Sequence, residues 1–303
     1  MKSIRIGTRS SKLAMAQTAW VQGRLAEKYP DARIETILIK TSGDRFVEAS
    51  LQAIGGKGIF TKEIEEALLR NEIDIAVHSM KDLPTELPAG LVIAAVPARE
   101  DSRDVLVSAG AENLSKLSAG ARVATGSLRR KAQILHHRPD LRMVPIRGNV
   151  DTRLKKLDAG ECDALVMAAA GLKRIGRGER IAEYIPNDIC LSAAGQGALG
   201  LESRQDESMR EDLSFLHDPL TFAEVFAERS FLNRLGGGCH VPVGARAVAE
   251  GKQLTLFGVV AHPDGSFLCR GETSGSVTHA KELGWQLAER LLSQGAEKIL
   301  VGQ

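Results

Sequence analysis

Three segments hold the residues that could carry out chemistry. The first is HSMKDLP at residues 78–84, which directly follows an apolar run. A carboxylate at Asp82, beside Lys81, could stabilise a developing cation in a cleft or exchange protons with a substrate nitrogen. The alternative is a surface turn closed by Pro84 and capped by Asp82. We expect His78 to be a packed, hydrogen-bonded histidine.

The second segment, from Arg122 to Arg180, is strongly positive although the whole chain is nearly neutral. It has 14 basic and 6 acidic residues, a net charge of +8, whereas the whole chain has a net charge of only +2. Its arginines stand where strands end and helices begin, and open parallel sheets bind ligands there. Ser127, Arg129 and Arg130 at a helix start predict an anion site, and arginine suits carboxylates. The alternative is a solvated surface on which these charges pair with acids.

The third segment is LGGGCHVPVG at residues 235–244. Three glycines allow a close approach of the backbone, and a thiol at Cys239 on such a turn could serve for attachment or as a nucleophile. Adjacent residues in an extended segment point apart, so His240 is a poor partner base and no nucleophilic triad is predicted. The alternative is a buried cysteine in a helix-ending turn.

The composition excludes several classes of protein. Near-neutral charge and 4% aromatic residues argue against nucleic-acid binding, and no apolar run approaches the roughly twenty residues that span a bilayer. The other cysteines, Cys162, Cys190 and Cys269, are far apart, which predicts buried thiols and neither a disulfide framework nor a metal site. The N-terminus lacks the apolar stretch of a signal peptide, so we expect a cytoplasmic protein.

Hydrophobic periodicity predicts α/β elements to position these segments. Strands are expected at 4–7, 34–40, 73–77 and 91–96, and helices at 11–28 and at 61–70, the latter capped by Thr61. The pattern restarts near Arg99, with strands at 104–107, 122–125, 143–146 and 164–167 and helices at 127–137 and 150–157. Such alternation predicts mostly parallel sheets covered on both faces.

The last third of the chain has a different pattern. After Pro219 we expect a long helix, two antiparallel strands and a closing helix, at 220–235, 253–261, 266–273 and 277–293. This order is typical of a small α+β domain. Residues 43–58 have little apolar periodicity and end in GGKG, which predicts a mobile loop beside a binding cleft.

Nine motifs together resemble the porphobilinogen deaminase (hydroxymethylbilane synthase) family. They occur in the family's order from Gly7 to Gly244: GTRSSKLAMAQ, GGKGIFTKEIE, DIAVHSMKDLP, SLRRKAQ, RPDL, IRGNVDTRLKKLD, AAAGLKR, GQGALGLE and GGGCHVPVG. Each motif is weak alone, and nine in register are highly specific. Beyond about Ala245 the resemblance is only in general character.

The resemblance implies a transferase of tetrapyrrole biosynthesis. Such enzymes join four porphobilinogen molecules head to tail, release ammonia at each step, and build the chain on one covalent dipyrromethane cofactor. The thioether cysteine maps onto Cys239, and the catalytic aspartate onto Asp82, with Lys81 beside it. Cofactor binding maps onto Ser127, Arg129, Arg130 and Asp82, and substrate binding onto Arg9, Ser11, Gln17, Arg147, Arg153 and Arg174. The segment 43–60 matches a flexible loop over the cleft.

We therefore expect two periplasmic-binding-protein-like α/β domains around a cleft and a small α+β domain. The boundaries are 1–98 with a return segment 196–216, then 99–195, then 217–303 with the cofactor cysteine. We expect a monomer whose partner is porphobilinogen, with no nucleic acid, membrane or metal. Each porphobilinogen carries an acetate and a propionate, so an anionic chain grows in the site and the +8 segment suits it.

Two departures and two alternatives accompany this interpretation. Gly126 stands where the family pattern has a serine and lacks that hydroxyl, and Ser192 stands where a proline is expected. The main alternative is a non-catalytic two-lobed binding protein for a polycarboxylate, since architecture says nothing about activity. A protein that binds RNA through the basic segment is disfavoured by the low aromatic content.

Overall fold

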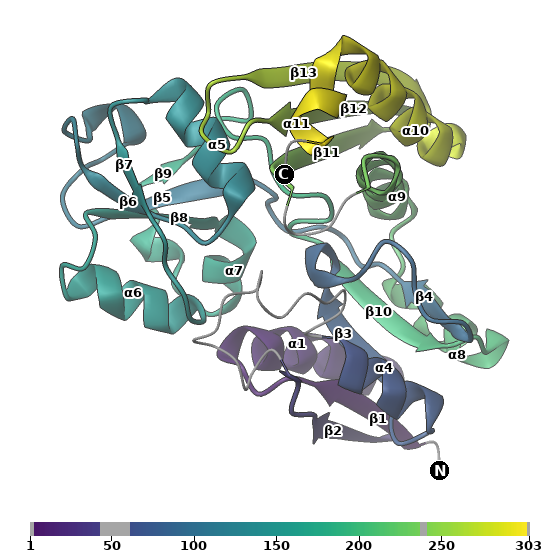
Figure 1. The fold of residues 1–303 in the computed structure, drawn as a ribbon. Coiled ribbons are helices and arrows are strands. Elements are labelled where there is room, and N and C mark those ends of the chain that lie inside the picture. The colour runs from purple at the N-terminus through teal and green to yellow at the C-terminus, as the bar shows by residue number, and fades with distance from the viewer. Residues whose placement is uncertain (1–2, 43–60, 237–240, 302–303) are drawn as a thin grey trace. The chain divides into compact units, whose positions relative to one another are not determined.

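The computed structural model describes residues 3–42, 61–236 and 241–301. It divides into two compact units (Figure 1). Unit 1 comprises Met1–Arg99 and Ala198–Phe222, and unit 2 comprises Glu100–Gly197 and Ala223–Gln303. The loop predicted at 43–58 and the cofactor cysteine predicted at Cys239 both lie outside the described residues.

Unit 1 is built on a five-stranded sheet in the order β2-β1-β3-β10-β4. The strands are β1 (Ser3–Thr8), β2 (Arg33–Leu38), β3 (Ile75–Ser79), β4 (Leu91–Ala95) and β10 (Leu199–Arg204). β1 runs parallel to β2 and β3, whereas β10 is antiparallel to both of its neighbours. The sheet is therefore mostly parallel, as predicted, and β10 is its one reversed strand.

Alternating residues of these strands face helices on both sides of the sheet. Ile4 and Val77 pack with α1 (Lys12–Lys28) and α8 (Glu207–Leu213). Ala76 packs with α4 (Lys62–Leu69) on the opposite face. Because neighbouring residues of a strand point to opposite faces, β3 is buried on both sides, which explains its continuous apolar run.

Unit 2 contains a second five-stranded sheet, in the order β7-β6-β8-β5-β9. Its strands are β5 (Asp104–Ser108), β6 (Arg122–Ala124), β7 (Arg142–Val144), β8 (Ala164–Ala168) and β9 (Glu183–Tyr184). Here β5 is the reversed strand, antiparallel to β8 and β9. Helix α5 (Leu128–His137) covers one face, and α6 (Val150–Asp158) and α7 (Ala169–Arg174) cover the other.

The C-terminal part of unit 2 is a three-stranded antiparallel sheet with helices on one face. Its elements are α9 (Pro219–Arg234), β11 (Val243–Glu250), β12 (Gln253–Ala261), β13 (Leu268–Ser276), α10 (Ala280–Leu291) and α11 (Glu297–Val301). Only two strands were predicted here. β11 was missed because its side chains are mostly small and weakly patterned.

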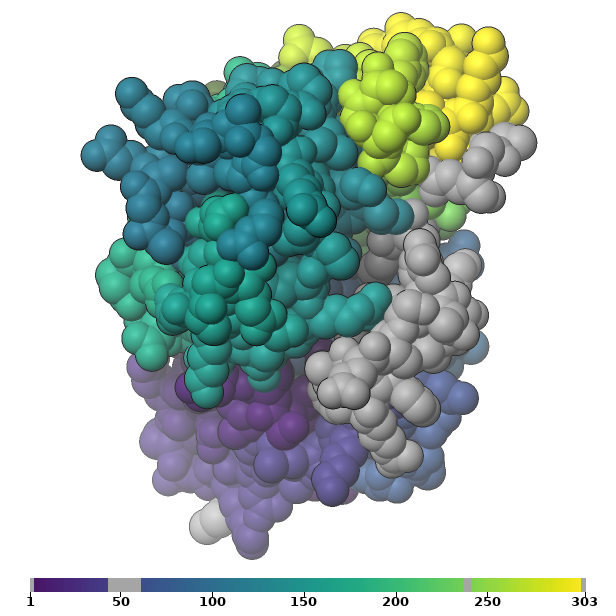
Figure 2. Space-filling model, turned by 60° about the vertical axis from the view of Figure 1, so that its left-hand side comes forward, coloured from purple at the N-terminus to yellow at the C-terminus, as the bar shows by residue number. Residues whose placement is uncertain are grey.

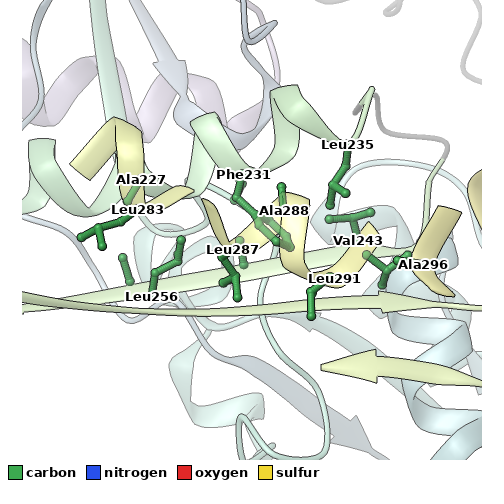
Figure 3. Packing of buried hydrophobic residues seen from close by; sticks show 14 of the residues in the cluster. Ala227, Phe231, Leu235, Val243, Leu256, Leu283, Leu287, Ala288, Leu291 and Ala296 are labelled. Atoms are coloured by element: carbon green, nitrogen blue, oxygen red, sulfur yellow. The ribbon is translucent and has the colours of Figure 1, made fainter. Parts of the chain in front are cut away.

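Small residues let α9, α10 and this sheet approach closely. Phe231 of α9 is fully buried, and Figure 3 shows it beside Leu287 and Ala288 of α10. A side chain at Gly258 of β12 would collide with the Phe231 ring, 2.6 Å away. A Cβ on Gly284 of α10 would lie 2.3 Å from the Ala227 carbonyl oxygen of α9. Glycine at 284 therefore sets the separation of the two helices.

The turn between β12 and β13 anchors the C-terminal sheet to α5. The Gly265 carbonyl lies 2.9 Å from His136 Nδ1, and Arg270 Nη2 donates to Gln133 Oε1 at 3.0 Å. A Cβ on Gly265 would lie 2.8 Å from the His136 amide nitrogen, so the turn needs glycine. Figure 2 shows the lime-green surface of this hairpin against the teal surface of the α5 region.

The predicted fold class is confirmed: two mixed α/β sheets with helices on both faces and a small α+β region. One boundary matters for function. The strand predicted at 73–77 is β3 (Ile75–Ser79), which places His78 and Ser79 within the sheet. No helix among the described residues is long and apolar enough to cross a membrane.

Two helix glycines form a matched test of this packing. Gly23 of α1 is exposed and a Cβ there would meet nothing within 4 Å, whereas Gly284 of α10 is in close contact with α9. Gly23→Ala should raise the free energy of unfolding by about 0.5–1 kcal/mol, because alanine restricts the unfolded chain. Gly284→Ala should lower it by about 1–3 kcal/mol through overpacking. Urea denaturation measures both, and a stabilising Gly284→Ala would contradict the packing described.

Candidate active site

In unit 1, the carboxyl ends of β1 and β3 open onto a pocket of about 60 Å³. The chain leaves β1 towards α1, and it leaves β3 into a 3-10 turn, Met80–Asp82. Ligands of open α/β sheets bind at this edge, where helices begin and strands end. The polar lining residues are Arg9, Ser11, Gln17, Thr61, His78, Ser79 and Asp82. The structure thus brings four of the predicted site residues, Arg9, Ser11, Gln17 and Asp82, to one pocket.

Helix α1 is fixed to this edge by two side chains. Ser11 is the N-cap of α1 and accepts a hydrogen bond from the Ala14 amide at 3.3 Å. The Gln17 Nε2 donates to Ser79 Oγ at the end of β3, at 2.8 Å. The positive end of α1 therefore points at the pocket, where Arg9 adds a full positive charge. This arrangement suits a carboxylate.

Asp82 is held at the pocket by the apolar residues on either side of it. Met80 and Leu83 are buried, and a Cβ on Gly200 of β10 would lie 2.9 Å from Leu83 Cδ1 and 3.0 Å from Met80 Cε. Gly200 thus leaves room for both anchors, and the turn between them presents Lys81 and Asp82 outward. Asp82 is exposed and lines the pocket, and it does not cap the turn.

His78 is packed and hydrogen-bonded, as predicted. Its Nε2 lies 2.9 Å from Oε2 of Glu202 on β10, and both side chains are buried. His78 also lines the pocket. It therefore connects the pocket with a buried carboxylate, which the pattern of the sequence did not reveal.

Unit 2 presents a corresponding edge at the carboxyl ends of β6 and β7. Ser127 is the N-cap of α5 and accepts from the Arg130 amide at 3.5 Å. Asn149 caps α6 and accepts from the Thr152 amide at 3.0 Å. Arg147 is exposed between β7 and α6. Two helix N-termini and Arg147 together form an edge with a positive electrostatic potential.

Arg153 belongs to the same edge. Its Nε donates to the Gly148 carbonyl at 2.8 Å, and its Nη2 lies 4.0 Å from where a Cβ on Gly126 would stand. That Cβ would also lie only 3.0 Å from the Ile146 carbonyl oxygen. The departure at Gly126 therefore leaves room for the close approach of the Ile146 carbonyl at the strand ends.

Arg129 and Arg130 do not project into solvent. Their guanidinium groups converge on Asp104, a fully buried carboxylate at the start of β5. Arg129 Nη1 donates to Oδ2 at 2.6 Å, and Arg130 Nε and Nη2 donate to Oδ1 at 2.9 and 2.8 Å. Gln196 Nε2 adds a donor to Oδ1 at 2.8 Å. The free anion-binding arginines expected here are bound to an internal counter-ion.

The charges of this cluster do not cancel. Burial alone would raise the pKa of Asp104, but the charges and hydrogen bonds of the two arginines outweigh it and hold that pKa well below its usual range. Burial and the nearby Asp104 charge raise the pKa of the Cys190 thiol to about 12. Two guanidinium groups, one carboxylate and a neutral thiol leave a net charge of +1. The guanidinium groups of the cluster also donate to other protein oxygens, Arg129 Nη1 to the Leu191 carbonyl at 2.6 Å and Arg130 Nη2 to Gln196 Oε1 at 3.3 Å. The cluster therefore fits a cofactor with carboxylate groups through its buried positive charge rather than through direct donors.

Arg174 lies at the chain crossing, the place in unit 2 where the segment that enters the unit at Glu100 meets the segment that leaves it at Gly197. Its Nη2 donates to the Gly197 carbonyl at 2.7 Å, and burial lowers the pKa of its guanidinium. A Cβ on Gly197 would lie 2.3 Å from the Glu100 carbonyl oxygen, so the two crossing segments touch here. The second departure, Ser192, is buried, and its carbonyl accepts from the Ala245 amide at 2.9 Å.

Several arginines of the segment from Arg122 to Arg180 form ion pairs with acids, as the alternative interpretation predicted. Arg122 pairs with Asp163, Arg138 with Asp140, and Arg180 with Asp158, at 2.8, 2.6 and 2.6 Å. Cys162, Cys190 and Cys269 are free and buried, as predicted.

The sequence analysis did not predict the roles of three residues of these sites. Asp104 and Gln196 are far apart in the sequence and meet only through the fold, although an acid that opens an apolar strand is itself a signal of a buried partner. Thr61 stands at the N-cap position of α4 as predicted, but its side chain makes no capping bond and instead lines the pocket.

Comparisons with known proteins match nearly the whole chain. The family model described as porphobilinogen deaminase, dipyromethane cofactor binding domain, matches residues 4–212, and the model of the C-terminal domain matches 222–293. Porphobilinogen deaminase of Geobacter metallireducens is 50% identical over 99% of this chain and 94% of its own length. That of Pelotomaculum thermopropionicum is 53% identical over 99% and 96%.

Among solved structures, a putative methionine-binding lipoprotein from Bacillus subtilis has a TM-score of 0.44 at 13% identity. The match covers 71% of this chain and 90% of that one.

The Asp104 cluster predicts both a large loss of stability and a pH dependence. Asp104→Asn should lower the free energy of unfolding by about 3–5 kcal/mol, because two buried guanidinium groups lose their counter-charge. The pKa of Asp104 is lower in the folded protein than the unfolded value of about 3.9. Its contribution is therefore complete above that value and is lost as the pH falls towards the folded pKa.

Urea denaturation at pH 7, 4 and 3 measures this effect. The wild type should lose more stability between pH 4 and 3 than Asp104→Asn loses, since only the wild type has this carboxylate to protonate. Parallel pH dependences in the two proteins would contradict the assignment.

Proposed function

The chain belongs to the porphobilinogen deaminase family, and we propose that the pocket of unit 1, with Asp82 on its rim, is where the reacting groups meet. The enzyme is a transferase of tetrapyrrole biosynthesis that condenses four porphobilinogen molecules into linear hydroxymethylbilane, with release of ammonia, on a dipyrromethane cofactor. The matches to both family models favour this function over a non-catalytic binding protein.

The observation that carries the proposal is the mixed character of the pocket. Arg9 and the N-terminus of α1 supply positive charge for a carboxylate, while Asp82 supplies the negative charge. Porphobilinogen has both kinds of group, since it bears an acetate, a propionate and an aminomethyl group. A pocket with both signs of charge can bind the acids and hold the nitrogen-bearing carbon beside Asp82.

Asp82 has a definite chemical task in this proposal. Loss of ammonia leaves a delocalised cation on the pyrrole ring, and a carboxylate close to the ring nitrogen stabilises that cation electrostatically. The same carboxylate can accept and return a proton at the nitrogen. Lys81, in the same turn, adds a donor for a substrate carboxylate. Neither task requires a nucleophilic side chain.

We propose that the edge of unit 2 binds the cofactor. Ser127, with the amides at the start of α5, Arg129 and Arg130 would hold its carboxylates, and Cys239 would supply the thioether. The net positive charge of the Asp104 cluster supports this assignment, although Arg129 and Arg130 act there mainly as buried charge. Arg147 and Arg153 would bind carboxylates of the growing chain, and Arg174 would act at the chain crossing.

We further propose that the protein is a cytoplasmic monomer with three domains, at 1–98 with 196–216, 99–195 and 217–303. Three free, buried cysteines suit a reducing compartment. The large exposed apolar side chains of the described residues are spread over several elements, such as Trp20 of α1 and Trp285 of α10, and scattered residues of this kind are normal on a monomer. Light scattering on the monomer would give 32.6 kDa.

Asp82→Asn tests the proposed catalytic role. The variant should fold and keep its two-pyrrole adduct, detected by intact mass, yet turn over porphobilinogen about 10²–10⁴-fold more slowly. Asp31→Asn, at another exposed aspartate of unit 1, is the matched control and should retain the wild-type rate. Cys239→Ser should lack the adduct. A near-normal rate for Asp82→Asn, or an adduct on Cys239→Ser, would refute the corresponding role.

Arg147→Leu tests whether substrate binding depends on the position of an arginine at the edge of unit 2 rather than on its charge alone. Arg142 and Arg147 are both exposed and lie at opposite ends of β7, with Arg147 beyond the carboxyl end. Loss of a charge-assisted bond should raise the KM for porphobilinogen about tenfold in Arg147→Leu. Arg142→Leu makes the same change in charge and should leave KM within about twofold. Equal KM values for the two variants would show that Arg147 binds no substrate carboxylate.

A further inference from the structure

A buried group of polar side chains lies at the unit 1 pocket and has no part in the mechanism proposed above. It consists of His78 on β3, Glu202 on β10, and Glu65 and Thr61 on and before α4. His78, Glu65 and Glu202 are 5%, 7% and 0% exposed. Burying two carboxylates and an imidazole costs free energy unless each is well paired. Glu65 Oε1 and Glu202 Oε1 have no hydrogen-bond partner among the described residues.

The hydrogen-bonding geometry of the group assigns the tautomer of the ring. Burial raises the pKa of the Glu65 carboxyl; its hydrogen bond with Thr61 opposes this effect, and the nearby charge of Glu202 adds to it. Glu202 is the carboxyl in contact with the imidazole, at 2.9 Å from Nε2. A carboxylate can only accept a hydrogen bond, so this contact places the donating N–H on Nε2 of the ring.

The other ring nitrogen of His78, Nδ1, is then the atom that can bind a further group. Within the described part of the chain, no hydrogen bond to His78 Nδ1 is found, and His78 lines the pocket. In a neutral imidazole with hydrogen on Nε2, Nδ1 carries the lone pair. The remaining charged groups of the pocket are Arg9, which only donates, and Asp82, which accepts.

Resting on the proposed function, we propose that His78 is a second recognition residue of the substrate pocket, with Nδ1 accepting a hydrogen bond from an N–H group of the substrate. Glu202 is a positioning residue that fixes the ring and its tautomer. Arg9 is the charged donor of the pocket and suits the carboxylates of a pyrrole acid. Nδ1 and Asp82 would be the acceptors that distinguish a substrate with pyrrole and aminomethyl N–H groups from a plain dicarboxylate.

Two amide substitutions separate this role from a structural one. Glutamine can place its amide near Nε2, so His78→Gln can keep the contact with Glu202 while it removes the acceptor at Nδ1. Asparagine places its amide near Nδ1, so His78→Asn keeps a polar atom there and abandons Glu202. We expect His78→Gln to lower kcat/KM for porphobilinogen about tenfold, mainly through KM. His78→Asn should lose less of kcat/KM but more stability to urea.

A purely structural role predicts the reverse order. The proposal is overturned if His78→Gln keeps kcat/KM within about twofold of the wild type, or if His78→Asn is the more impaired of the two in KM.

A second measurement does not depend on turnover. Nitrogen-15 NMR of the histidine-labelled holoenzyme reports which ring nitrogen is protonated, and the signal missing from His78→Gln identifies His78 among the seven histidines. We expect hydrogen on Nε2 in the neutral ring, and hydrogen on Nδ1 would overturn the proposal. Failure of the proposed function would instead appear as a wild-type protein without an adduct or activity, and the tautomer could still be read.

Discussion

A single buried carboxylate organises unit 2. Asp104 receives hydrogen bonds from two consecutive arginines of α5 and from Gln196, so one side chain fixes strand β5, helix α5 and the segment that leaves the unit. The interaction is strong because water is excluded from it. For the same reason, removing either the carboxylate or the guanidinium charges alone would leave the other buried without a counter-charge. The surplus positive charge is a consequence of this arrangement. Structural need and anion binding are therefore met by the same residues.

Unit 1 reaches a similar result by different means. Among its described residues the edge has no buried arginine pair, and its polar groups are held by a helix cap, an amide–hydroxyl bond and a buried His78–Glu202 pair. The glycine at 200 has a specific steric role, because Met80 and Leu83 fill the space that a side chain would take. Apolar anchors on both sides of Asp82 allow an exposed carboxylate to occupy a defined place.

Sequence reasoning predicted the parts of this molecule that depend on local pattern. Periodicity located most helices and strands, and Ser11 and Ser127 were recognised at helix starts, where both are N-caps. It failed where the partners are distant. Nothing near Arg129 signals that its guanidinium is bound to Asp104, and nothing near His78 points to Glu202, 124 residues away. The strand β10 was not predicted, and the reversed direction of β5, which was predicted as a strand at 104–107, was not foreseen because pairing direction leaves no local trace.

In each five-stranded sheet the reversed strand directly follows a passage of the chain from one unit to the other: β5 is the first strand made in its sheet and β10 the last made in its own. β10 lies between β3 and β4, yet it is made only after the whole second sheet. During synthesis the first sheet is therefore incomplete, with one edge of β3 and both edges of β4 unpaired, until about a hundred further residues have been made. Such edges invite wrong pairing. Unit 1 cannot be completed from its N-terminus in sequence, and Glu202 is among the last groups of that unit to reach its partner.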